Sequence, residues 1–317
     1  MTPKILLTGK NGQVGHDLHD LLPRLGEVVA LDRQHLDLSH PDEIRRVVRE
    51  IHPDLIVNAA AYTAVDQAER EESLAEAMNA RAPAILAEEA ERIGAAIVHY
   101  STDYVFDGTK NSPYEEGDRT NPLSAYGRTK LAGERAIRES GAHHLIFRTA
   151  WVYSTRGKNF LLTILRLATE RDELRIVNDQ FGAPTWSREI ASASAQVLQR
   201  ILDRKEKSSA WDERSGTYHM TAAGETTWFE FAKAILDAAQ TQSNAASSWF
   251  AAATSGKPLV TRKMVPITTS DYPTLARRPS YSVLSNARLA QIFGIKLADW
   301  RTQLNRACAD ERIGPTN

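Results

Sequence analysis

A glycine-rich turn near the start of the chain restricts the fold more than any other feature. The segment Thr8-Gly-Lys-Asn-Gly-Gln-Val-Gly15 follows the apolar run Lys4–Thr8 and opens a helical pattern over residues 13–22. In a Gly-x-x-Gly-x-x-Gly turn the glycines permit a tight bend, close approach of the backbone to a pyrophosphate, and close helix–strand contact. The helix N-terminus adds unpaired N–H groups and positive dipole. The turn therefore predicts a dinucleotide site around Gly9, Gly12 and Gly15.

The first half of the chain then alternates short apolar runs with longer amphipathic ones. Strands are predicted at 4–8, 27–31, 54–58, 95–101 and 144–149, and helices at 13–22, 43–51, 75–93 and 125–139. This alternation is typical of parallel strands joined by right-handed helical crossovers. We expect an α/β fold with a Rossmann-like, doubly wound parallel sheet, and a dinucleotide-binding domain over residues 1–152.

The second half has a different rhythm and predicts a smaller α/β lobe. Helices are expected at 159–170, 188–202 and 228–239, and a strand at 173–177. We assign residues 153–317 mainly to a substrate-binding lobe whose segments interleave with the first domain. The polar stretches 203–216 and 240–257 are interpreted as surface insertions or mobile loops.

Composition excludes several classes of partner. The 39 basic and 40 acidic side chains give a net charge of −1, which offers no field for nucleic acid or an anionic membrane. No apolar run approaches the ~20 residues that span a bilayer, and the N-terminal run is a predicted strand, not a signal peptide. The single cysteine, Cys308, excludes an intrachain disulfide. We expect a cytoplasmic protein.

Two side chains after the second predicted strand bear on which cofactor binds. Asp32 lies about 20 residues beyond the glycines, where a carboxylate hydrogen-bonds the adenosine ribose of NAD(H). Arg33 is suited to the 2′-phosphate of NADP(H). The sequence therefore predicts a nicotinamide cofactor, NADH or NADPH, and leaves the choice open.

Tyr126 and Lys130 are four residues apart at the start of a predicted helix, so they share one helix face. Random placement gives about 0.3 such Tyr-x-x-x-Lys pairs in this chain, so the pair gains meaning from context. Thr102 lies at the carboxyl end of the fourth predicted strand, just beyond residues 95–101, where ligands bind in open α/β sheets. A hydroxyl and a phenol could flank one carbonyl there, and Lys130 is expected to lower the pKa of Tyr126. Thr102, Tyr126 and Lys130 are therefore the candidate catalytic residues.

Taken together, these motifs resemble the extended short-chain dehydrogenase/reductase superfamily. Further segments resemble the dTDP-4-dehydrorhamnose reductase family: Asn58-Ala-Ala-Ala-Tyr-Thr-Ala-Val-Asp66, Phe147-Arg-Thr-Ala-Trp-Val-Tyr153, Asn178-Asp-Gln-Phe-Gly-Ala-Pro-Thr185 and Arg278-Pro279. The resemblance implies that cofactor contacts are made by Gly12, Gln13, Val14, Asp32, Asp37, Leu38, Ala61, Tyr62, Thr63, Tyr126 and Lys130. It implies substrate contacts by Thr102, Asp103, Tyr104 and Trp151.

The reaction implied by the resemblance is reduction of a 4-keto group on a dTDP-linked deoxysugar by NADH or NADPH, giving dTDP-L-rhamnose. Tyr126 would protonate the nascent alkoxide. No metal-ligand motif is found among the histidines, although the resemblance allows Mg²⁺ at a subunit contact. A homodimer is a further expectation.

Two alternatives remain open from the sequence. One is a nucleotide-sugar epimerase or dehydratase, although no glutamate follows Asp103 to complete the acid/base pair of a dehydratase. The other is a non-catalytic regulatory subunit of S-adenosylmethionine synthetase, which resembles the same reductases.

Overall fold

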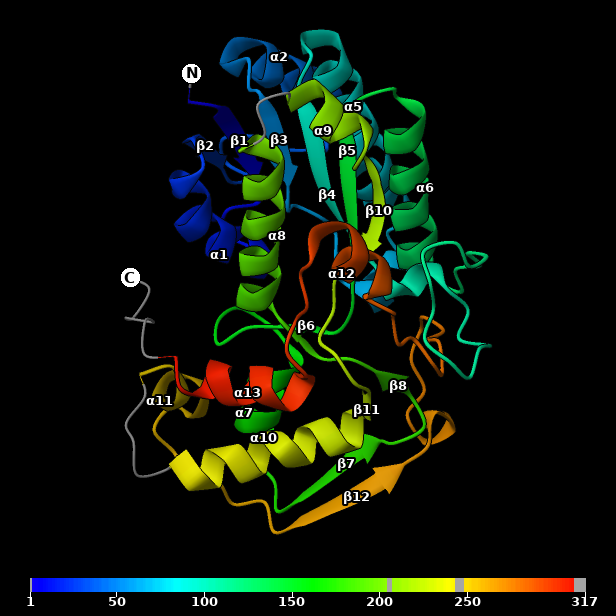
Figure 1. Ribbon diagram of the computed structural model, residues 1–317. Helices are drawn as coiled ribbons and strands as arrows, with labels where there is room; N and C mark the ends of the chain where they lie inside the picture. The colour runs from blue at the N-terminus through cyan, green and yellow to red at the C-terminus, as the bar shows by residue number, and fades with distance from the viewer. Residues whose placement is uncertain (1, 204–206, 243–247, 311–317) are drawn as a thin grey trace.

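The fold is built on one parallel sheet of six strands. The computed structural model describes residues 2–203, 207–242 and 248–310. The strand order is β2-β1-β3-β4-β5-β10, and every neighbouring pair is parallel (Figure 1). The strands are β1 (Lys4–Thr8), β2 (Glu27–Leu31), β3 (Leu55–Asn58), β4 (Ala96–Thr102), β5 (His144–Thr149) and β10 (Gly216–His219). The predicted doubly wound parallel sheet is confirmed.

Helices cover both faces of this sheet, and alternating strand residues supply the two hydrophobic cores. On one face Ile5 and Leu7 pack with α1 (Gln13–Leu21), α8 (Ser187–Leu202) and α12 (Ala287–Phe293). On the other face Leu6 packs with α2 (Pro41–Ile51), α5 (Ala82–Ile93) and α6 (Ala125–Glu139). The strands are apolar on both sides because helices bury both faces of the sheet. Each fully buried aliphatic side chain contributes roughly 1.5–3 kcal/mol to the stability of the fold.

A crossover of short helical pieces leads from β3 to α5. Its parts are α3 (Val65–Ala68), α4 (Glu72–Glu76) and a π-helical turn over Ala77–Arg81. The predicted helix over 75–93 is therefore three consecutive pieces. Asn79 in the π turn is buried, and its amide bonds the backbone N–H and carbonyl of Tyr62. The crossover is thus held against the loop that follows β3.

The rest of the chain forms a smaller lobe beyond the carboxyl edge of the sheet (Figure 1). The hydrophobic core of this lobe is formed mainly by α7 (Phe160–Ala168), α10 (Trp228–Gln242), α11 (Ser248–Thr254) and α13 (Trp300–Cys308). β7 (Glu173–Val177) pairs in parallel with β12 (Lys263–Ile267). Two short pairs complete it: β6 (Val152–Tyr153) with β9 (Thr185–Trp186), and β8 (Phe181–Gly182) with β11 (Thr226–Thr227). No described helix is long and apolar enough to cross a membrane.

The interpretation of the two polar stretches as loops was wrong for the residues that the structure describes. In the first stretch α9 (Lys207–Asp212) packs Trp211 into the main core, and β10 follows. In the second stretch α11 buries Trp249 in the core of the lobe. Residues 204–206 and 243–247 lie outside the described part. The polar residues of these stretches gave no sign of α9 and α11, each of which buries one tryptophan.

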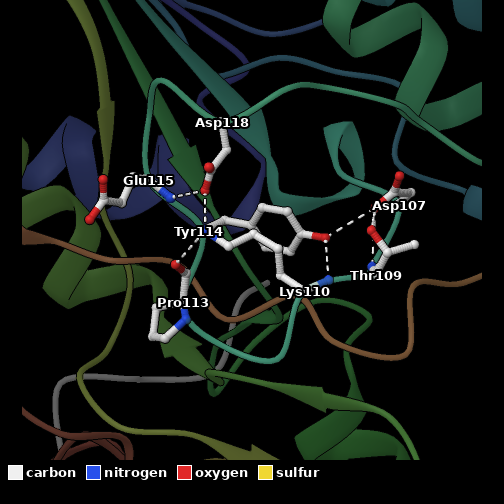
Figure 2. Close-up of polar contacts among 7 residues, drawn as sticks. All are labelled: Asp107, Thr109, Lys110, Pro113, Tyr114, Glu115 and Asp118. Carbon is white, nitrogen blue, oxygen red and sulfur yellow. Dashed lines mark hydrogen bonds and ion pairs between the residues drawn. The ribbon is translucent and has the colours of Figure 1, made fainter.

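The loop between β4 and α6 is cross-linked internally (Figure 2). Asp107 accepts hydrogen bonds from Thr109 and from the Tyr114 hydroxyl, and Lys110 pairs with Asp118 at 2.5 Å. The Tyr114 ring stacks on Phe106 at 4.2 Å between centroids. These contacts fix the loop that separates the end of β4 from the start of α6, and the candidate catalytic residues lie at those two ends.

Candidate active site

The glycine-rich turn forms a close backbone cradle between β1 and α1. Gly9 has φ of +73°, and a Cβ there would lie 2.8 Å from the backbone of Ala60. A Cβ on Gly15 would lie 2.0 Å from the Gly9 carbonyl oxygen, so this position serves helix–strand contact. Gly12 is the N-cap of α1 and provides no side-chain cap. The first N–H groups of α1 are thus available to an anion, which fits the pyrophosphate of a dinucleotide.

A cleft of about 370 Å³ extends from this turn along the carboxyl edge of the sheet. Most residues predicted to contact the cofactor line it: Gly9, Gly12, Gln13, Val14, Asp32, Arg33, Leu38, Ala61, Thr63, Tyr126 and Lys130. Sequence analysis missed other lining residues: Thr8, Asn11, Leu36, Ala59, Ala60, Met78, Tyr100, Ser101, Thr149 and Val152. Several of these are ordinary strand or loop residues whose position depends on the fold.

Three of the predicted cofactor residues do not line the cleft. Gly15 packs against the turn, as described above. Asp37 accepts hydrogen bonds from the backbone N–H and hydroxyl of Ser39, which holds the loop after β2. The Tyr62 hydroxyl donates to Glu71 at 2.7 Å. In this structure these residues support the walls of the cleft.

Asp32 lies at one end of the cleft in a basic setting. Its carboxylate is 2.6 Å from His35 Nδ1 and 3.4 Å from Lys10 Nζ. The hydrogen bond from His35, aided by Lys10, lowers the pKa of Asp32 to about 2. Arg33 is largely exposed and pairs with Asp37 at 3.3 Å. Both an acceptor for a ribose hydroxyl and cations for a phosphate are therefore present at this end.

Tyr126 and Thr102 meet where β4 ends and α6 begins. Ser124 caps α6 by accepting a hydrogen bond from the Gly127 N–H, and a Cβ on Gly127 would lie 2.3 Å from the Tyr104 carbonyl oxygen. The glycine thus lets the helix start closely approach the strand end. Burial raises the pKa of Tyr126 to about 12, while a hydrogen-bonding interaction with Thr102 works against this rise. Tyr126 is therefore protonated at neutral pH, as a proton donor requires.

The hydrogen-bonding neighbours of the Lys130 amine are residues other than Tyr126. Its Nζ donates to the Tyr100 carbonyl at 2.6 Å and lies 3.0 Å from His99 Nε2. Burial lowers the pKa of Lys130 to about 7. Burial is the largest cause of the raised Tyr126 pKa, and the expected lowering of that pKa by Lys130 stays a prediction. The two side chains still line the same cleft.

The three remaining substrate candidates lie beside this pair. Asp103 is buried, accepts from the Thr102 hydroxyl at 3.0 Å, and has its pKa raised to about 6 by burial. The Tyr104 ring meets the Tyr126 ring edge-on, with centroids 5.7 Å apart. Trp151 has φ of +47° and stacks on Trp228 at 3.5 Å. Such a strained backbone is often found at a functional site.

A second cavity, of about 570 Å³, lies in the smaller lobe. Trp228 contributes to its wall, as do Arg171, Arg175 and Arg278. Arg278 pairs with Asp66 at 2.7 Å and hydrogen-bonds Tyr104, so it links the lobe to the sheet domain. An aromatic wall with several guanidinium groups is suited to a nucleotide base and its phosphates. Apart from the Arg278–Pro279 resemblance, sequence reasoning missed this cavity, because its residues come from distant segments.

Among residues 2–203, 207–242 and 248–310, no group of three or more His, Cys, Asp or Glu side chains could hold a metal ion. The Mg²⁺ that the resemblance allowed therefore has no site within the described part of one chain.

A parallel sheet with a phosphate-binding turn, and a threonine, tyrosine and lysine at its carboxyl edge, defines a nicotinamide-dependent dehydrogenase or reductase of the short-chain type. Comparison with known proteins narrows the class. Residues 3–313 match the family model described as the RmlD substrate binding domain. A dTDP-4-dehydrorhamnose reductase of Burkholderia thailandensis is 52% identical over 298 residues, covering 94% of this chain and 95% of that protein. The Escherichia coli K12 protein of the same name is 43% identical, covering 95% and 96%.

Solved structures agree. A dTDP-4-dehydrorhamnose reductase from Bacillus anthracis in complex with NADP superposes with a TM-score of 0.83 and 32% identity, covering 96% of this chain and 98% of that one. The Clostridium acetobutylicum structure also gives a TM-score of 0.83, with 35% identity and coverage of 96% and 98%. The chain belongs to the dTDP-4-dehydrorhamnose reductase family.

Proposed function

We propose that the protein reduces the C4 keto group of dTDP-4-dehydro-L-rhamnose to give dTDP-L-rhamnose, with NADH or NADPH as the reductant. The observation that carries this proposal is the interaction of Thr102 with protonated Tyr126, which lines the cleft that begins at the phosphate-binding turn. The family relatives carry the name of this reductase. None of the relatives described above is named as an epimerase, a dehydratase or a regulatory subunit.

Within this function the cofactor cleft holds the nicotinamide nucleotide along the carboxyl edge of β1, β3 and β4. The cradle of Gly9 and Gly12 takes the pyrophosphate, and Asp32 with Arg33 takes the adenosine end. The nicotinamide supplies a hydride to C4 when bound. Tyr126 and Lys130, which line the same cleft, would lie beside that ring.

Tyr126 and Thr102 act on the carbonyl oxygen. With substrate bound, the Thr102 hydroxyl would turn its single proton from Asp103 to the carbonyl oxygen. The phenol of Tyr126 would give its proton to the same oxygen as negative charge develops there. Burial keeps this proton on Tyr126 until charge appears, since the pKa is raised to about 12. No metal is needed in this scheme to polarise the carbonyl.

We place the dTDP portion in the cavity of the smaller lobe. Arg171, Arg175 and Arg278 line this cavity and offer charge-assisted hydrogen bonds to a diphosphate. The flat ring of Trp228 offers a stacking surface for thymine. Trp228 lines this cavity and stacks on Trp151, so we place the sugar against this pair of rings.

The test is turnover of the purified protein with dTDP-4-dehydro-L-rhamnose, generated from its precursor by an epimerase, and with NADH or NADPH in separate reactions. Substrate-dependent oxidation of the cofactor and formation of dTDP-L-rhamnose support the proposal. Folded protein that oxidises neither cofactor overturns it, and co-purification with an S-adenosylmethionine synthetase would then favour the regulatory alternative.

A further inference from the structure

The chain passes from the sheet to the smaller lobe at Trp151, which lies between β5 and β6. The next residue, Val152, lines the cofactor cleft. The Trp151 ring stacks on Trp228, which lines the cavity of the lobe. The position of Trp151 therefore bears on both cavities, of which the first would hold the hydride donor and the second the sugar nucleotide.

Trp228 covers one face of the Trp151 ring. The two ring centroids are 3.5 Å apart, and the planes are 5° from parallel. Trp228 is itself fixed, because its Nε1–H donates to Gln180 Oε1 at 3.2 Å and Phe160 packs on it with centroids 4.5 Å apart. It also directly follows β11, which pairs with β8.

Gly182 of β8 lies against the other face of the Trp151 ring. A Cβ on Gly182 would lie 2.6 Å from both Cζ2 and Nε1 of Trp151, and nearer still to Cε2, the ring atom between them. An approach within the ring plane would leave Cζ2 and Nε1 farther away, so this position lies over the ring face. Rings 3.5 Å apart are in van der Waals contact, so no backbone fits between them. Gly182 and Trp228 therefore lie on opposite faces of Trp151.

The requirement for glycine at position 182 comes from this ring and not from the backbone. The φ of Gly182 is not positive, so an alanine can adopt the same conformation. The three atoms nearest to the added Cβ all belong to Trp151. A glycine within a strand often marks a place where another group approaches closely. Here the approaching group is the indole, and a larger residue would displace it.

The backbone of Trp151 depends on such support. Its φ of +47° is unfavourable for a residue with a side chain, and such a conformation persists only where the surroundings determine it. The Trp151 carbonyl accepts a hydrogen bond from the Thr185 N–H at 3.2 Å. Residues 180–185 thus support Trp151 at its carbonyl, at one ring face, and through Trp228 at the other.

We propose that Gly182 is a positioning residue of this enzyme. Because it has no side chain, it admits the Trp151 ring between β8 and Trp228, and this packing sets the alignment of the lobe cavity with the cofactor cleft. The consequence for catalysis rests on the proposed reductase function: the sugar held by the lobe must present C4 to the nicotinamide. A misplacement of about 1 Å can lower a rate about 10²-fold.

The position of the ring can be measured without substrate, by ¹⁹F NMR of the full chain labelled with 5-fluorotryptophan. The chain has six tryptophans, and the Trp151→Phe variant identifies the Trp151 signal by its loss. Gly182→Ala should change the chemical shift of that signal, because the added methyl group displaces the ring from Trp228. An unchanged Trp151 signal in the folded variant overturns the inference.

The effect on alignment is measured with dTDP-4-dehydro-L-rhamnose and NADPH. Gly182→Ala should lower kcat by about 10- to 10²-fold, while NADPH binds with nearly the original affinity, as measured by calorimetry. A loss of stability alone would not separate kcat from cofactor binding in this way. An unchanged kcat beside a displaced ring would show that this packing does not set the alignment.

A second background tests whether Gly182 acts through Trp151. With Trp151→Ala in place there is no ring to displace, so adding Gly182→Ala should lower kcat no further. An equal fall in both backgrounds overturns the inference. If Gly182→Ala alone does not fold, the double variant should fold because the clash is gone, and failure of both to fold would contradict the proposal.

Gly117→Ala is the matched control. A Cβ on Gly117 meets no atom of the described residues within 4 Å, and its φ is not positive. This variant should keep both the Trp151 signal and kcat of the unsubstituted protein, and changes like those of Gly182→Ala would contradict the inference. Because the NMR measurement needs no turnover, failure of the ring packing is distinguished from failure of the proposed reductase function.

Discussion

Lys130 Nζ lies 3.0 Å from His99 Nε2, so the lysine of the Tyr-x-x-x-Lys motif contacts a buried histidine of β4. Burial lowers the pKa of Lys130 to about 7 from 10.5. The unfolded chain therefore binds more protons than the folded protein between these two values. This relationship has a consequence for stability that can be measured without substrate.

The contribution of Lys130 to the free energy of unfolding should rise with pH from about 7 toward 10. Below that range both states carry the proton, and the folded state bears the full cost of a buried charge. Lys130→Met should flatten this rise, as measured by urea unfolding at several pH values. An equal pH dependence in the two proteins would show that Lys130 is protonated in the folded state like an ordinary lysine.

Asp103 should show the opposite pH dependence. Burial raises its pKa from 3.8 to about 6, so the folded protein keeps the proton to higher pH than the unfolded chain. Its contribution to stability is full at low pH and is lost as pH rises through about 6. Asp103→Asn should therefore be more stable at neutral pH, by about 1–2 kcal/mol, while turnover falls because a substrate contact is changed. The stability of the variant is compared with that of the unsubstituted protein at pH 4 and at neutral pH. A difference that favours the variant less at neutral pH than at pH 4 would contradict this prediction.

Arg148 and Arg138 provide a matched test of burial, because both pair with the buried Glu134. Arg148 is 3% exposed and makes two hydrogen bonds to the carboxylate, whereas Arg138 is 37% exposed and makes one. Arg148→Leu should cost about 3–5 kcal/mol, because it leaves a buried charge without its main partner. Arg138→Leu should cost less than about 1 kcal/mol. Chemical denaturation measures both, and similar losses would argue against the buried pair.

Arg33 is predicted to support binding of NADPH. It is exposed at the adenosine end of the cleft, where a 2′-phosphate would lie. Arg33→Ala should raise the KM for NADPH about tenfold, the value of one charged hydrogen bond, and leave the KM for NADH nearly unchanged. NADH serves as the control in the same protein. Equal effects on both cofactors would place Arg33 outside the phosphate site.

Much of the fold could be predicted because local patterns and tertiary environment agree. The strand boundaries at β1, β2 and β5 and those of α6 match the apolar runs and the serine before α6. The short strand β10 was missed because its four residues, which begin where a polar stretch ends, are too few to show a periodicity. Its place beside β5 depends on long-range pairing.

The site was predictable where chemistry is local and not where it depends on burial. The turn, Thr102 and Tyr126 carry their own signals. His99 looked like any residue of an apolar strand, and its contact is with a lysine 31 positions away. The pKa values of Tyr126 and Lys130 follow from burial, which sequence spacing does not reveal.

The most direct test of the account compares the unsubstituted protein with Tyr126→Phe in the coupled assay with dTDP-4-dehydro-L-rhamnose. The substitution removes only the hydroxyl that gives the proton. The account predicts that kcat falls by about 10²- to 10⁴-fold, while NADPH still binds, as measured by calorimetry, with nearly the original affinity. An unchanged kcat in the folded variant would contradict it, because the proton would then come from another group.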